Sequence, residues 1–126
     1  MRKFNLPLTY KPKIPGVIEG SIRQTIRPGR KFSPADLVAF HGWEGIPYRS
    51  KWSFRTPYTS LIEVLDIEIE TRGILLPSGR ARWAELDTLA RLDGIDPPTG
   101  EGLKNVLFGM HPIHIGEKLE GQVIRW

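Results

Sequence analysis

The chain of 126 residues has no cysteine and no long uninterrupted run of apolar residues. Without cysteine it has neither a disulfide framework nor a thiolate zinc site. A membrane-spanning helix needs about 20 consecutive apolar residues, and no signal-peptide core is present in the first thirty residues either. We therefore expect a soluble protein in a reducing, cytoplasmic setting, with no membrane partner.

Acidic residues are scarce in the first half of the chain. Residues 1–60 contain 11 Lys and Arg but only 3 Asp and Glu, a net charge of +8, whereas residues 61–126 contain 7 and 11, a net charge of −4. A basic half is typical of proteins that contact phosphate backbones, so nucleic acid is the first partner to consider. The alternative is a basic surface that serves solubility alone.

Candidate metal ligands are also sparse. His111 and His114 lie close together, but no third histidine or carboxylate stands at a matching spacing. The sequence therefore predicts no metal site, and nothing in it indicates a cofactor. A chain of this length without an internal repeat fits a single domain, residues 1–126, with a core of its own. The sequence carries no indication of an oligomeric state.

The most informative segment is Gly20-Ser-Ile-Arg-Gln-Thr-Ile-Arg27. Its β-branched residues favour an extended chain, which places Arg23, Thr25 and Arg27 on one face. Two guanidinium groups in such a row suit phosphates or a base edge, and the hydroxyl group can donate one directional hydrogen bond. The alternative is a polar row that only solvates an exposed sheet face.

Basic and aromatic side chains continue through residue 58. Trp43, Tyr48, Trp52 and Phe54 are candidate platforms for stacked bases, of which we expect one or two to be exposed. The cationic side chains are candidates for sequence-independent contacts with phosphates, with ordinary surface charge as the alternative. The candidate nucleic-acid-binding residues are Arg23, Thr25, Arg27, Arg30, Lys31, Arg49, Lys51, Trp52 and Arg55.

The residue patterns predict short strands and a few short helices. We expect strands over residues 6–10, 21–27, 37–40, 58–71, 73–76 and 119–126, and a loop or irregular hairpin over 48–54. Gly20 and Gly94 should end helices within 11–20 and over 80–92, and Asp96 with Pro97 should open another helix. Together these elements predict an α+β fold, a small mixed or partly open barrel.

Three positions carry more specific structural expectations. The apolar pattern of the strand over 58–71 shifts at Val64, which indicates either a bulge or burial on both faces. Trp83 lies on the apolar face of its predicted helix and is expected in the core. Trp126 is expected to plug the barrel.

Five motifs occur in a fixed order along the chain, namely Ile18-x-Gly20, Gln24-Thr25-Ile26-Arg27, Asp36-Leu37, Ala90-x-x-Asp93-Gly94 and Gly121-x-Val-Ile-Arg-Trp126. In this order they resemble the ASCH family of the PUA-like superfamily, with the closest similarity to its phage-type and prokaryotic branch. The resemblance covers about residues 6–126. It implies a PUA-like small β-barrel of about five or six strands with two or three short helices, and a cleft beside the Gln24–Arg27 segment.

The resemblance also implies functions. Family members are thought to bind RNA or modified nucleosides, and some resemble amidohydrolases that use a lysine, a threonine and a carboxylate. By position the threonine is Thr25 and the carboxylate is Asp93, but the lysine position holds Ile22. Arg23 cannot replace a general base because it stays protonated, although it can hold an anion or polarise a carbonyl. Alternatively, Asp93 only shapes the turn with Gly94.

We therefore expect an RNA- or nucleotide-binding module that uses a basic cleft. The alternative is an amidohydrolase acting on N-acetylated cytidine or a related modified nucleoside, with Thr25 and Asp93 in the chemistry. The isoleucine at the lysine position weakens this alternative, because a threonine hydroxyl needs an adjacent base. A third hypothesis is a ribonuclease that uses Asp93 and His41.

Overall fold

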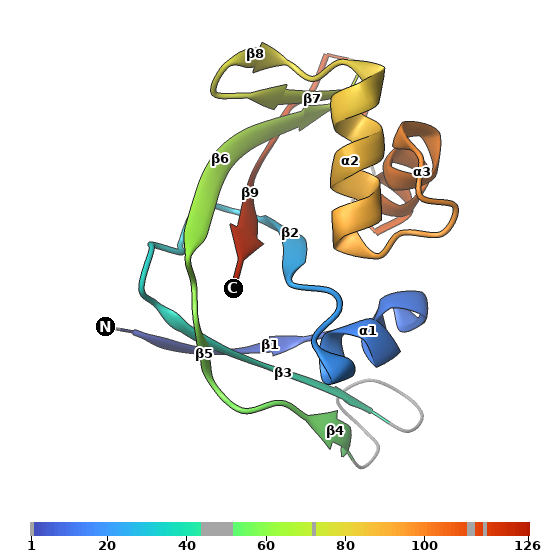
Figure 1. Ribbon diagram of the computed structural model, residues 1–126. Helices are drawn as coiled ribbons and strands as arrows, with labels where there is room; N and C mark the ends of the chain where they lie inside the picture. Colours follow the sequence, from blue (N-terminus) through green and yellow to red (C-terminus); the bar gives the residue numbers. More distant parts are fainter. Residues whose placement is uncertain (1, 44–51, 72, 111–112, 115) are drawn as a thin grey trace.

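The computed structural model describes residues 2–43, 52–71, 73–110, 113–114 and 116–126. In these residues the chain forms two β-sheets, three α-helices and a short 3-10 helix, so the predicted α+β class is confirmed. Figure 1 shows α2 and α3 packed side by side at one end of the molecule and α1 at the other, with the C-terminus between the two sheets.

The first sheet contains the strands β1 (Lys3–Pro7), β3 (Leu37–Trp43), β4 (Trp52–Arg55) and β5 (Thr59–Ser60). Its order is β1-β3-β4, and β5 also pairs with β3. The β1–β3 pair is parallel, whereas β4 and β5 run antiparallel to β3. The first strand is found at residues 3–7 and not at the predicted 6–10. It lies at an edge of its sheet, where Pro7 does not interrupt a ladder.

The second sheet is antiparallel and contains β2 (Gln24–Pro28), β6 (Glu63–Glu70), β7 (Gly73–Leu76), β8 (Gly79–Arg80) and β9 (Leu119–Arg125). Its order is β2-β9-β6-β7-β8, so the Gln24–Arg27 segment lies in an edge strand. The strand predicted over 58–71 is present as two strands, β5 and β6, in different sheets, and Ile67 and Ile69 of β6 are buried in the core. Of the two alternatives for Val64, two-sided burial is correct. Val64 and Leu65 pack against different core clusters, and β6 pairs with β9 without a register shift.

The helices are η1 (Lys11–Lys13), α1 (Ile14–Glu19), α2 (Trp83–Asp93) and α3 (Gly100–Met110). The predicted helix ends at Gly20 and Gly94 are confirmed, since both glycines adopt a left-handed conformation with φ of 89° and 73°. One core cluster lies between the second sheet and the pair α2 and α3, and the other joins the first sheet to α1 and the C-terminus. No helix in the described residues combines the length and apolar character that crossing a bilayer requires.

Three structural predictions need correction. The strands do not close into one barrel of five or six strands, because the described residues form two separate sheets with no shared strand. Trp83 is not a core residue and is 62% exposed, with its ring beside Gly100 at the start of α3 and Lys104 Nζ over the ring. Asp96 does not cap α3. The helix begins at Gly100, where the Thr99 hydroxyl accepts a hydrogen bond from the backbone N–H of Gly102.

Trp126 is buried as predicted. Its ring lies 4.6 Å from that of Phe40, centroid to centroid, at a tilted angle, and it belongs to the core cluster of the first sheet. The last residue of the chain thus joins the second sheet, through the end of β9, to the first. Trp126 follows β9, the strand that pairs with β2, so this packing connects the β2–β9 edge of the second sheet to the first sheet.

Candidate active site

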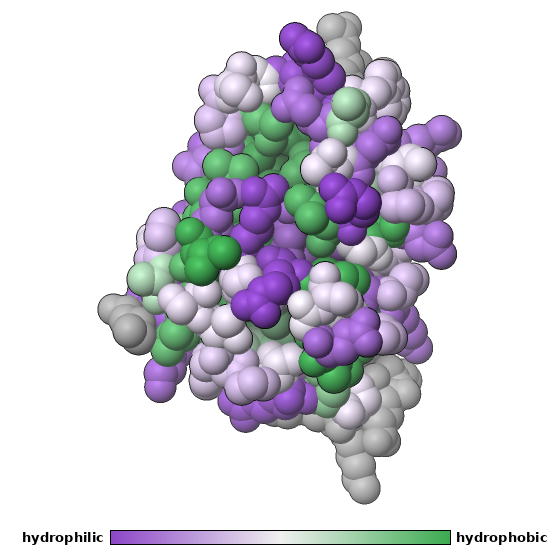
Figure 2. All heavy atoms as spheres, viewed as in Figure 1, coloured by the Kyte–Doolittle hydropathy of each residue, from purple (hydrophilic) through white to green (hydrophobic). Residues whose placement is uncertain are grey.

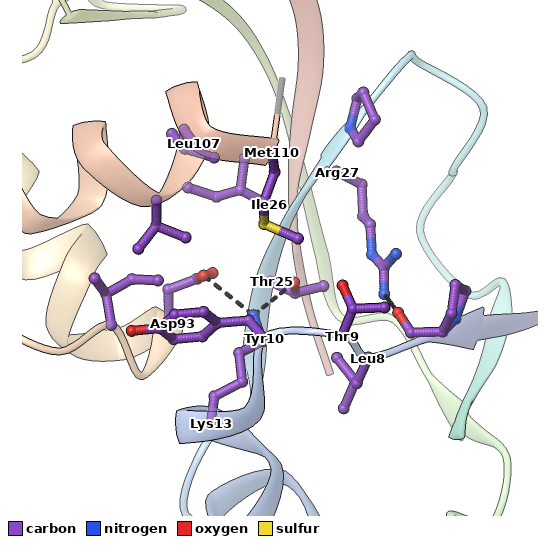
Figure 3. A pocket seen from close by; sticks show the side chains of 14 residues that line it. Leu8, Thr9, Tyr10, Lys13, Thr25, Ile26, Arg27, Asp93, Leu107 and Met110 are labelled. Atoms are coloured by element: carbon purple, nitrogen blue, oxygen red, sulfur yellow. Dashed lines mark hydrogen bonds and ion pairs between the residues drawn. The ribbon is translucent and has the colours of Figure 1, made fainter. Parts of the chain in front are cut away.

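A pocket of about 240 Å³ opens between the end of β1, the strand β2 and the helices α2 and α3. One side is apolar and is formed mainly by Ile26, Ile95, Val106, Leu107 and Met110. The floor is polar and consists of Lys13, Thr25 and Asp93, as Figure 3 shows. The space-filling view in Figure 2 shows hydrophilic side chains at the centre of this face of the molecule, flanked by hydrophobic ones.

The polar floor is a hydrogen-bonded group of three buried side chains. Lys13 Nζ donates to Thr25 Oγ1 at 2.8 Å and to Asp93 Oδ2 at 3.1 Å. Lys13 is 4% exposed, Thr25 3% and Asp93 4%. A lysine amine and a carboxylate are seldom buried to this extent unless they are paired, so the three side chains form one unit.

Burial is the largest influence on the pKa of Lys13. Removal of the amine from water lowers its pKa from the usual value of 10.5, and the nearby Arg27 guanidinium acts in the same direction. The Asp93 carboxylate opposes this effect through its charge and its hydrogen bond, but the net direction is downward. The amine therefore gives up its proton more readily than a lysine in solution, and its neutral form can act as a base.

The expectation that no lysine stands beside Thr25 is wrong. The lysine comes from η1, twelve residues before Thr25 in the chain, and not from position 22 of the extended segment. Ile22 instead packs between α1 and the end of α2, close to Gly16 and Gly94. No periodic pattern marks Lys13. Its long side chain reaches Thr25 from a proline-flanked turn in a different part of the chain. Counting residues along the segment that contains Thr25 therefore does not lead to Lys13.

Gly94 allows this arrangement. A Cβ atom at position 94 would lie 3.0 Å from the Cβ of Lys13 and would also collide with the Ile22 side chain. The glycine thus ends α2 in a left-handed conformation and leaves room for the Lys13 stem to pass beside Asp93. The Asp93-Gly94 step therefore both shapes the turn and positions the carboxylate.

The predicted row of Arg23, Thr25 and Arg27 is only partly brought together. Thr25 and Arg27 line the same pocket, and Arg27 donates from one of its terminal nitrogens to the Pro7 carbonyl oxygen at 2.6 Å. Arg23 does not line the pocket. It precedes β2, and its Nε donates to the carbonyl oxygen of Trp126 at 2.7 Å.

The remaining predicted contacts lie outside the pocket. Arg30 donates to the Ile67 carbonyl oxygen at 3.2 Å, Lys31 lies over the rings of Phe4 and Phe32, and Arg55 donates to Asn5 Oδ1 at 3.3 Å. Phe54 is half-buried against Gly42. Arg49, Lys51, Tyr48 and the side chains of Trp43 and Trp52 lie outside the described residues, so their predicted roles remain predictions.

His41 and Asp93, the pair of the ribonuclease hypothesis, do not share the pocket. His41 is buried in β3, and this burial, with the charges of Arg55 and Arg27, lowers its pKa. Within the part of the chain that the structure describes, no three histidine and carboxylate side chains lie close enough to hold a metal ion. His111 falls outside that part.

Comparison of the chain with protein-family models, with curated proteins and with solved structures finds no match. The chemistry of the pocket is therefore inferred from its own geometry and charges.

Proposed function

We propose that the pocket is the active site of an amidohydrolase that removes an acyl group from the exocyclic amine of a modified pyrimidine, such as N-acetylated cytidine. The observation that carries this proposal is the buried Lys13 amine 2.8 Å from the Thr25 hydroxyl. A threonine hydroxyl becomes a competent nucleophile when a base of lowered pKa lies within hydrogen-bond reach. The resemblance to ASCH proteins supports the proposal, because some of them resemble amidohydrolases with these three residue types.

The reaction follows from the three side chains. Thr25 Oγ attacks the acyl carbon while its proton passes to the Lys13 amine, and a tetrahedral adduct forms. The carbon–nitrogen bond then breaks, and the Lys13 ammonium returns the proton to the departing amine nitrogen. Water then attacks the threonyl ester while its proton passes to Lys13, and the bond between the acyl carbon and Thr25 Oγ breaks. The Lys13 ammonium returns the proton to Thr25 Oγ, which releases the carboxylic acid and restores both side chains. Asp93 accepts a hydrogen bond from the Lys13 amine throughout and keeps it directed at Thr25.

The shape of the pocket suits a small, flat acylated ring. Its volume of about 240 Å³ lies below the roughly 300–1,000 Å³ of typical sites for larger ligands. Tyr10 and Met110 also line the pocket, and Figure 3 shows the apolar side chains of Leu107 and Met110 across from the polar floor. A pyrimidine ring can lie against the apolar wall while its acyl carbonyl reaches Thr25.

The direct test is hydrolysis of N-acetylated cytidine by the purified protein. We expect release of cytidine and acetate with a turnover on the order of 1–10 per second, measured by liquid chromatography. Acid quenching during turnover should leave one acetyl group on the peptide that contains Thr25, detected by mass spectrometry. N-methylated cytidine is the matched control, because it has the same ring but no acyl carbonyl, and it should be unchanged.

Two results would contradict the hydrolase. One is the absence of cytidine release from an intact, folded protein over several hours. The other is a product that forms without any acyl-threonine intermediate and at the same rate after Thr25 has been replaced.

Binding of RNA or a nucleotide is a second candidate function, and a different observation favours it. Lys3 and Arg55 are exposed beside Tyr58 on the first sheet: Lys3 Nζ lies 5.4 Å from the centre of the Tyr58 ring, and both Arg55 and the Tyr58 hydroxyl donate to Asn5 Oδ1. Cationic groups beside a partly exposed aromatic ring are suited to phosphates and a stacked base. This surface would hold the polymer while the pocket holds one base, so the two candidate functions are compatible.

Salt dependence tests the second candidate. If Lys3 and Arg55 each neutralise one phosphate, alanine at either position should reduce the slope of log K against log salt by about one charge in filter binding to single-stranded RNA. Lys118→Ala is the matched control, because Lys118 is also exposed but pairs with the Glu68 carboxylate at 3.2 Å on the second sheet. Equal slopes for all three variants and the unmodified protein would exclude this surface as the binding site.

A further inference from the structure

A row of polar side chains crosses the second sheet and ends at the proposed active site. Gln24 on β2 and Glu63 on β6 are both in direct register with Arg125 on β9, so the three residues lie side by side on neighbouring strands. Arg125 pairs with the Glu63 carboxylate, and Arg125 Nε donates to Gln24 Oε1 at 2.8 Å. The row thus joins the partly exposed Glu63 carboxylate to the buried Asp93 through Arg125 and Gln24.

The orientation of the Gln24 amide is determined by its partners. Arg125 can only donate, so it requires the amide oxygen, and the Leu89 carbonyl can only accept, so it requires the amide nitrogen at 3.1 Å. The nitrogen therefore faces Asp93 and donates to Oδ1 at 3.4 Å, while Lys13 occupies the other carboxylate oxygen, Oδ2. Gln24 is 2% exposed, so water does not compete for these bonds.

We propose that Gln24 is a positioning residue of the site, and that its amide, held by Arg125 and Leu89, keeps the Asp93 carboxylate directed at Lys13. Adjacent residues of a strand point to opposite faces. Because β2 is an edge strand, Gln24 reaches Asp93 from one face of the sheet while Thr25 meets Lys13 on the other. The expected change in rate rests on the proposed hydrolase function. The expected change in the titration of Lys13 does not depend on that function.

The test compares two buried glutamines. Gln122 on β9 is 3% exposed and is likewise bonded through its amide, but to Phe32 and Asp66 and not to the site. Gln24→Glu and Gln122→Glu each place a carboxyl group in the same sheet. Only Gln24→Glu adds a negative charge beside Asp93, so it should raise the midpoint of the Lys13 titration by about one pH unit or more. NMR of protein with carbon-13-labelled lysine measures that midpoint directly.

The kinetic readout is separate. Gln24→Met should lower kcat by about 10- to 100-fold with little change in KM, because loss of a supporting hydrogen bond misplaces the group that it orients. In Gln24→Glu the acid limb of the rate profile should move to higher pH, together with the NMR midpoint. A residue that only supports folding would lower the rate equally at every pH. Gln122→Met should retain the unmodified rate.

The outcomes separate this inference from the proposed function. A Lys13 midpoint that rises in Gln24→Glu and falls in Gln24→Met, with no change in the two Gln122 variants, supports the positioning role even if the protein hydrolyses nothing, because Gln24→Met removes the hydrogen bond to Asp93 without adding a charge. Equal midpoints in Gln24→Met and Gln122→Met overturn it even if hydrolysis is observed. If Gln24→Glu does not fold, Arg125→Gln provides the same test with Arg80→Gln as its control. Loss of the donor that fixes the Gln24 oxygen should loosen the Asp93 carboxylate and lower the Lys13 midpoint, because Asp93 raises the pKa of Lys13 through its charge and hydrogen bond. An unchanged midpoint overturns the inference.

Discussion

Replacement of Thr25 with valine is expected to lower kcat for N-acetylated cytidine by roughly 10³- to 10⁶-fold. Valine has the shape of threonine but no hydroxyl, so the nucleophile is removed while the buried volume at this 3% exposed position is kept. Losses of this size are typical when the nucleophile of an acyl-transfer site is removed. The Kd for the substrate should change little, because the apolar wall and the ring contacts of the pocket are intact. Single-turnover kinetics and equilibrium binding measure the two quantities separately.

Two control variants accompany Thr25→Val. Thr25→Ser keeps a hydroxyl within reach of Lys13 and should retain a measurable part of the rate. Thr88→Val removes a threonine hydroxyl on α2 that donates to the Ala84 carbonyl oxygen, outside the pocket, and should leave the rate unchanged. A Thr25→Val protein that keeps its rate within tenfold would show that Thr25 is not the nucleophile. The Lys13 amine would then have to activate water directly.

The sequence predicted the parts of this fold that local chemistry determines. The glycine stops at positions 20 and 94 depend on a left-handed conformation that other residues rarely adopt, and both are present. The buried side of β6 follows from a period of two, which Ile67 and Ile69 satisfy. Such features involve neighbours in sequence, so a single chain contains the information.

Arrangement in space was harder to predict. Trp83 carries the periodicity of a core residue, yet it lies at the first position of α2, where only the start of α3 covers it. The separation into two sheets likewise depends on which strands pair over long distances, as in the parallel pairing of β1 with β3. Residue patterns within one element do not determine such pairings.

In the candidate site, too, some residues could be predicted from the sequence and one could not. Thr25 and Asp93 were proposed from motifs in the sequence, and the structure joins them through the Lys13 amine. Lys13 was missed because its role depends on the reach of a long side chain across three elements, and nothing in the turn around it distinguishes it from Lys11. A lysine between two prolines shortly before an extended segment is a weak signal, but a lysine at 4% exposure is a strong one once a structure exists.

Replacement of Lys13 with methionine is expected to lower the free energy of unfolding by about 3 kcal/mol and to reduce turnover by about 10²- to 10⁴-fold. The substitution leaves Asp93 as a buried carboxylate that has lost its cationic partner, and among the residues that the structure describes only the Gln24 amide still donates to it. The rate falls because Thr25 no longer has a base. Urea unfolding at pH 7 and single-turnover kinetics measure the two effects.

The double variant Lys13→Met/Asp93→Leu distinguishes function from stability. Replacement of both members of a buried ion pair by apolar residues is often neutral or stabilising, so the double variant should regain most of the stability that Lys13→Met loses. It should not regain activity. A pair that contributes little to stability but is required for turnover is retained for its chemistry. A double variant less stable than Lys13→Met would instead indicate that the pair serves the fold.

The pH dependence of unfolding provides an independent measure of the buried amine. Because the pKa of Lys13 is lowered in the folded protein, this residue loses its proton at a pH below 10.5, whereas in the unfolded chain it keeps the proton up to about 10.5. In the window between these two values the unfolded state binds more protons, so the contribution of Lys13 makes the protein more stable as pH rises. Lys13→Met should lack this contribution, and the difference between the two unfolding curves isolates it. Parallel curves would mean that Lys13 titrates as in water, which would remove the base from the proposed reaction.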